Sequence, residues 1–166
     1  MAEDVGESAE RDGAGGEGAG VEPARAVSGA VRFRSGDTVL AGHLARPASA
    51  NVAPGRPGLV LCHGFPSGPK SAASSGQTYP ELAERLADEA GWVVLSFDFR
   101  GTGESGGDFS LGAWLADLRA AVDHLLATGD AGGVWLCGSS TGGSLAICAA
   151  AEDERVRGVA TLSARA

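Results

Sequence analysis

The 166-residue sequence contains no apolar run that approaches the ~20 residues needed for a membrane-spanning helix. Its first residues, MAEDVGESAE, also lack the basic and then apolar stretches of a secretory signal. We therefore expect a cytoplasmic protein that does not associate with membranes. The cysteines lie inside apolar runs without metal-ligand spacing, which predicts buried free thiols and no metal site; they are Cys62, Cys137 and Cys148.

Basic residues are scarce, especially at the start of the chain. The formal net charge is -8, and residues 1–27 combine acidic residues with many Gly and Ala residues and almost no apolar side chain to bury. Ordering such a segment costs backbone entropy without a compensating core. We expect a disordered acidic tail over residues 1–27, followed by one folded domain over residues 28–166. The acidity also argues against nucleic-acid binding.

Short apolar runs alternate with longer amphipathic ones in the rest of the chain. Residues 31–35 and 38–46, separated by the turn residues Gly36 and Asp37, predict an antiparallel hairpin. Further strands without polar alternation, typical of strands covered on both faces, are predicted at 58–62, 92–97, 133–138 and 156–163. Strands and helices in regular succession predict the α/β class, with a mostly parallel sheet and helices on both faces.

Three helices are expected between these strands. Residues 79–91 have Pro80 in a first turn and end at Gly91, a start and a stop typical of a helix. Residues 111–128 carry an apolar stripe, and His124 lies off that stripe, where we expect it to be solvated. Residues 141–153 are nearly all apolar, so this helix should be buried.

The run Gly138-Ser139-Ser140-Thr141-Gly142 fits the pattern G-x-S-x-G with Ser140 at its centre. A predicted strand precedes it and a predicted helix follows it. In that context a sharp turn exposes the serine as a nucleophile, and the flanking glycines let the strand and the helix approach each other. A turn of small residues without any chemistry is the alternative.

An activated serine needs donors for the negative charge that develops on the substrate oxygen. The backbone N–H of Thr141, at the start of a helix, is one candidate. The loop His63-Gly64-Phe65 follows another predicted strand and offers the N–H of Phe65, whereas Pro66 has none to offer. We expect His63 itself to be a structural loop histidine rather than a base.

Three motifs in this order, CHGFP, FDFRGTGESGG and GSSTGGSLA, resemble the α/β-hydrolase fold and, more narrowly, its esterase and serine-peptidase-like members. The resemblance implies that Ser140 is the nucleophile and that Phe65 and Thr141 form the oxyanion hole. His63, Gly64, Gly138 and Gly142 then support the motifs, while Asp98 and Arg100 belong to a structural loop. It also implies a small-molecule acyl substrate (an ester, amide or thioester) and no cofactor.

The run Gly101 to Gly106 spells G-x-G-x-x-G after a strand, the fingerprint of a dinucleotide site. The match is weak for two reasons. Glu104 would place a carboxylate where the pyrophosphate must lie, and the next helix begins only near Leu111, too late to receive the phosphates.

No histidine follows Ser140, although a serine hydrolase of this fold takes its base and its acid from later loops. The acids after Ser140 form one cluster, Glu152, Asp153 and Glu154, and six strands are predicted where the complete fold usually has eight. We expect the N-terminal part of a hydrolase, with the acid and the histidine absent and an uncovered edge strand over 159–162. A non-catalytic protein of this fold that binds a ligand or a partner is the alternative.

Overall fold

A computed structural model describes residues 27–48, 55–66 and 69–164, with side chains of the first helix described from residue 78 onward. The predicted acidic tail over residues 1–27 lies outside the described residues except for its last residue, and so it stays a prediction. Val27, the first described residue, already begins a strand.

Six strands form one sheet in the order β1-β2-β4-β3-β5-β6. They are β1 (Val27–Ser35), β2 (Thr38–Arg46), β3 (Arg56–Cys62), β4 (Val93–Phe97), β5 (Ala131–Ser139) and β6 (Val156–Leu162). The first two form the predicted hairpin, whose turn contains Gly36 in a left-handed conformation (φ 58°), and β2 pairs antiparallel with β4. The remaining pairs are parallel, as predicted for the α/β class.

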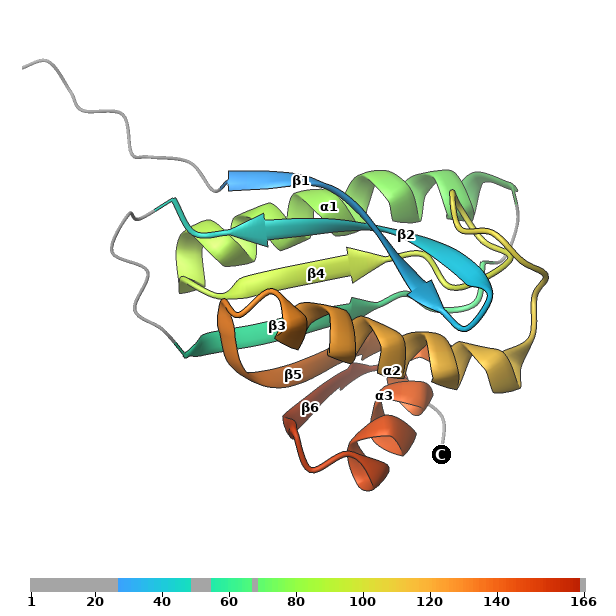
Figure 1. Ribbon diagram of the computed structural model, residues 1–166. Coiled ribbons are helices and arrows are strands. Elements are labelled where there is room, and N and C mark those ends of the chain that lie inside the picture. Colours follow the sequence, from blue (N-terminus) through green and yellow to red (C-terminus); the bar gives the residue numbers. More distant parts are fainter. Residues whose placement is uncertain (1–26, 49–54, 67–68, 165–166) are drawn as a thin grey trace, which may run out of the picture.

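Helices cover both faces of this sheet (Figure 1). They are α1 (Pro69–Ala90), α2 (Leu111–Ala127) and α3 (Thr141–Glu152). Because successive strand residues point to opposite faces, Leu59 and Leu61 of β3 pack in the cluster with α1, whereas Val60 packs in the larger cluster with α2 and α3. The absence of polar alternation in β3 and β4 follows from burial on both faces.

The first helix is longer than predicted, because it begins at Pro69 and not near residue 79. Pro80 therefore lies inside the helix, where it lacks an N–H and crowds the carbonyl four residues earlier. The prediction treated this proline as a first-turn residue, since residues 69–78 carry no apolar stripe. The predicted end is confirmed: Gly91 adopts φ 70°, and its N–H donates to the Ala87 carbonyl at 3.1 Å.

The C-terminal part of the described chain is more exposed than predicted. Helix α3 buries one face against the sheet, but Ile147 and Cys148 are exposed, so the expectations of a fully buried helix and of a buried Cys148 thiol were wrong. An almost wholly apolar sequence cannot indicate which face of a helix lacks a partner. Strand β6 lies at the edge of the sheet with Val159 and Leu162 exposed, as expected for an edge but not for a strand covered on both faces.

The expectation of a solvated His124 was also wrong. The hairpin folds over α2, so the His124 ring stacks on Phe33 with a centroid separation of 4.7 Å. Burial lowers the pKa of His124 below its usual value, and the charge of Arg46 acts in the same direction. The side chains predicted along the apolar stripe of α2 lie in the core or pack against it. Within the described residues, no helix is long and apolar enough to cross a membrane.

Candidate functional site

Ser140 lies at the turn between β5 and α3, where the sequence predicted it. Its backbone adopts φ 50° and ψ -119°, a conformation that is uncommon for a residue with a side chain. The Ser140 N–H donates to the Leu162 carbonyl of β6 at 2.8 Å, which helps to hold the turn. Ser140 is the N-cap residue of α3, yet its side chain makes no capping hydrogen bond and the residue is exposed. The hydroxyl is therefore not used to stabilise the helix that it precedes.

Glycines make this turn possible because they remove side chains from backbone contacts. An ideal Cβ on Gly138 would lie 2.5 Å from the Gly143 nitrogen, and one on Gly142 would lie 2.5 Å from the Cys62 carbonyl oxygen. A Cβ on Gly143 would lie 2.9 Å from the Gly138 oxygen. Strand β5, helix α3 and the end of β3 therefore touch through their backbones, as predicted for Gly138 and Gly142.

The loop after β3 reaches the same turn. An ideal Cβ on Gly64 would lie 3.2 Å from the Ser140 Cβ and 3.1 Å from the Ser139 carbonyl oxygen. Phe65 follows Gly64 directly, and Thr141 follows Ser140 as the first residue of α3. Because parallel strands end at one edge of the sheet, β3 and β5 bring Ser140, Phe65 and Thr141 together at that edge.

His63 is the first residue of this loop, and its buried side chain is held in one neutral form. The Phe99 N–H donates to its Nε2 at 3.2 Å, so Nε2 is an acceptor, and Nδ1 donates to the Gly64 carbonyl at 2.7 Å. Burial lowers the pKa of His63, an effect that the Gly64 hydrogen bond and the Asp98 charge partly oppose. These contacts support the structural role expected of His63, because neither ring nitrogen is left to accept a proton from Ser140.

Asp98 and Arg100 stabilise the long loop between β4 and α2. The Asp98 carboxylate accepts the Glu104 N–H at 3.0 Å, and burial raises the pKa of Asp98. Arg100 forms an ion pair with the fully buried Asp117 of α2 at 2.6 Å. The sequence reading missed Asp117, although an acidic residue on the buried side of an apolar stripe was a signal that it has a partner.

The same loop does not provide a phosphate cradle. Five of its backbone N–H groups donate within the protein: those of Gly101, Thr102, Glu104, Ser105 and Gly106. Helix α2 begins only at Leu111, as predicted. The glycines are explained by packing, since an ideal Cβ on Gly101 would lie 2.9 Å from the Asp108 carbonyl carbon. We therefore set the dinucleotide interpretation aside.

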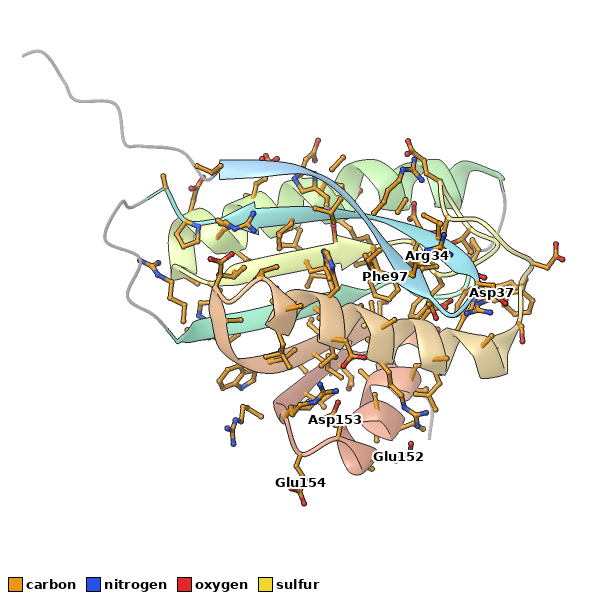
Figure 2. The ribbon with its side chains drawn as sticks, viewed as in Figure 1. Arg34, Asp37, Phe97, Glu152, Asp153 and Glu154 are labelled. Atoms are coloured by element: carbon orange, nitrogen blue, oxygen red, sulfur yellow. The ribbon has the colours of Figure 1, made fainter. Side chains whose placement is uncertain are left out.

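The other predicted histidines and acids lie elsewhere. His43 on β2 contacts Glu84 of α1 at 3.0 Å. Figure 2 shows Glu152, Asp153 and Glu154 together near the C-terminal end of α3, the end opposite Ser140. Within this acidic cluster, Glu152 pairs with Arg119, and Asp153 pairs with Arg155 at 2.7 Å. Over the ranges 27–48, 55–66 and 69–164, no group of three or more His, Cys, Asp or Glu side chains is placed to hold a metal ion.

Comparison with known proteins identifies the family. Residues 59–165 match the model of the Alpha/beta hydrolase family. The match covers more than half of the chain. It includes the loop after β3, the loop between β4 and α2, and the turn at Ser140. The chain therefore belongs to the alpha/beta hydrolase family, as the three sequence motifs predicted. No curated protein matches it.

Several solved structures have the same fold. Hypothetical protein PA2218 from Pseudomonas aeruginosa is 30% identical with a TM-score of 0.70, over 85% of this chain and 44% of that one. XC6422 from Xanthomonas campestris, a serine hydrolase without a lid, is 29% identical with a TM-score of 0.59, over 75% and 56%. The Pyrococcus furiosus esterase Pf2001 is 24% identical with a TM-score of 0.65, over 81% and 51%. The chain spans about half the length of these proteins.

Proposed function

We propose that the chain carries the nucleophile and the oxyanion hole of a serine hydrolase that cleaves an ester, amide or thioester. In this proposal Ser140 is the nucleophile, and the backbone N–H groups of Phe65 and Thr141 stabilise the oxyanion. The observation that carries it is the backbone of Ser140, held at φ 50° between β5 and α3 with its side chain exposed and free of any capping role. Strain of this kind persists only where the surrounding structure enforces it, and it clusters at functional sites.

The chemistry follows the acyl-enzyme route. The Ser140 oxygen attacks the substrate carbonyl carbon, and its proton passes to a general base. The base then returns that proton to the leaving group as the bond between the carbonyl carbon and the leaving group breaks. Water hydrolyses the acyl-serine ester by the same steps. The oxyanion that forms twice along this route would lie between the Phe65 and Thr141 N–H groups, where the positive end of the α3 dipole adds to its stabilisation.

We further propose that the base and its orienting acid come from outside the 166 residues. His63 is neutral with both nitrogens in hydrogen bonds, His43 contacts Glu84, and His124 lies under the hairpin. None of these contacts is with Ser140. The family relationship supports the proposal, since the chain spans about half the length of the similar structures.

The lack of contact between Ser140 and any of these histidines also favours a second candidate function, a non-catalytic protein of this fold that binds a ligand or a partner. If nothing supplies a base, the exposed Ser140 and the neighbouring loop would form a binding surface without chemistry. The two candidates differ in whether an acid and a histidine follow in the natural gene product.

Hydrolysis of a short-chain aryl ester distinguishes them. We expect negligible activity from the 166-residue chain, and activity from the chain extended through any reading frame that follows Ala166. In the extended form Ser140→Ala should lower turnover by several orders of magnitude, because nucleophile and base act as a unit. Ser139→Ala is the matched control and should keep most of the activity.

An inactive extended chain would favour the non-catalytic function. Strong activity in the 166-residue chain that disappears in His63→Ala would show that the base was assigned wrongly.

A further inference from the structure

Two half-exposed aromatic side chains contact each other, one of them on the loop that reaches the Ser140 turn. Phe65 and Phe109 have 56% and 49% of their surface accessible to solvent. Their rings meet edge to face with a centroid separation of 5.3 Å and an interplanar angle of 89°. We call these two residues the aromatic ledge. Phe65 comes from the loop after β3, and Phe109 comes from the loop before α2.

The aromatic ledge rests on a rigid base. Both rings pack on Trp114, with centroid separations of 6.2 Å for Phe65 and 5.2 Å for Phe109. Trp114 is fully buried, stacks on Phe99 at 4.5 Å, and donates from Nε1 to the Arg100 carbonyl at 3.0 Å. Contact with this buried ring restricts the Phe65 and Phe109 side chains, so a ligand that covers them would have less to order.

The position of the ledge connects it to the candidate nucleophile. Gly64 packs against Ser140, and Phe65 is the next residue along the chain. A carbonyl carbon bonded to the Ser140 oxygen would therefore lie next to the loop that carries Phe65, where the aromatic ledge begins. Burying an exposed aromatic ring against an apolar group is favourable, and an edge-to-face contact with another ring adds to the stabilisation.

We propose that the aromatic ledge binds the aryl part of the substrate, and that Phe109 is a specificity-determining residue for aryl-substituted acyl groups. This proposal rests on the proposed function of Ser140. An acetyl group is too short to cover both rings, whereas an acyl group that carries a phenyl ring can pack against them. Substrates with an aryl acyl group should then be preferred over acetyl substrates.

A binding measurement tests the ledge without requiring hydrolysis. Phenylacetate and acetate carry the same carboxylate and differ by one phenyl ring, and each can be titrated by NMR against the ¹⁵N-labelled full gene product that contains residues 1–166. We expect phenylacetate to shift the amide signals of Phe65 and Phe109, and acetate to leave the Phe109 signal nearly unchanged. Phe109→Ala should weaken phenylacetate binding about fivefold, the size of one lost aromatic pair.

Two further variants keep the test decisive. Phe109→Leu retains an apolar side chain without the ring, so it should fold and still bind phenylacetate less tightly than the wild-type chain. Ile147→Ala removes an equally exposed apolar side chain from α3 and should bind like the wild-type chain. Unchanged phenylacetate binding in both Phe109 variants, or equal binding of acetate and phenylacetate, would overturn the proposal. Ser140→Ala should retain binding, so a failure of the nucleophile assignment would be seen separately, in the ester assay.

Discussion

Replacing Gly142 by alanine should destabilise the fold, because this glycine lies where α3 meets the end of β3. An ideal Cβ there would lie 2.5 Å from the Cys62 carbonyl oxygen and closer still to the His63 oxygen. Real Cβ contacts of under 3.0 Å are essentially unknown, so the two backbones would have to separate by at least 0.5 Å. Neither contact atom belongs to a side chain that could rotate away.

The expected cost follows from the contact. Overpacking of a tight site costs ~1–3 kcal/mol, and the upper half of that range applies where backbone must move. Alanine in place of glycine inside a helix returns up to ~1 kcal/mol. We therefore expect a net loss of about 2 kcal/mol, which lowers the melting temperature by about 8 °C in a domain of this size. The loop that carries Gly64 and Phe65 should also move away from Ser140.

Thermal unfolding followed by circular dichroism measures this effect, and Gly112→Ala is the matched control. Gly112 lies in the first turn of α2 with nothing within 4 Å of an added Cβ. The control should be neutral or gain up to ~1 kcal/mol. The reasoning would be refuted if Gly142→Ala were as stable as Gly112→Ala.

Three further outcomes are expected. Asp117→Ala should cost about 3–5 kcal/mol in urea unfolding, because it leaves Arg100 without its buried partner; a loss of under about 1 kcal/mol would contradict this. Burial lowers the pKa of His63 and His124 from 6.5, so the folded state binds fewer protons and stability should fall as the pH drops below that value. His124→Gln should reduce this dependence of stability on pH, measured as the urea midpoint of unfolding. A urea midpoint of the wild-type protein that rises on acidification would contradict the expected loss of stability. The exposed edge strand β6 should make the 166-residue chain self-associate in analytical ultracentrifugation, whereas a monodisperse monomer would argue against this.

The sequence predicted the local features well. Short apolar runs predicted all six strands, since such runs leave few alternatives in an α/β pattern. The turn at Ser140 was predictable because backbone contacts at Gly138 and Gly142 admit no other residue without movement. Of the candidate site, the placement of Ser140 next to the Gly64 loop followed from the parallel order of β3 and β5.

Features that depend on tertiary packing were not predictable. His124 looked solvated because nothing in its helix indicates that the hairpin folds over it and brings Phe33 against its ring. The exposure of Cys148 depends on which side of α3 lacks a partner among the described residues. The aromatic ledge was missed for the same reason, since Phe65 and Phe109 lie 44 residues apart in the sequence and meet only once the chain folds around Trp114.

The assignment of Ser140 as the nucleophile is tested most directly by covalent labelling. An alkyl fluorophosphonate reacts with an activated serine: the serine oxygen bonds to phosphorus, fluoride leaves, and the hydroxyl proton passes to the base. Peptide mass spectrometry of the full gene product that contains residues 1–166 would locate the adduct. We predict one adduct on Ser140, lost in Ser140→Ala and retained in Ser139→Ala. An adduct on Ser139, or labelling that persists in Ser140→Ala, would contradict the assignment.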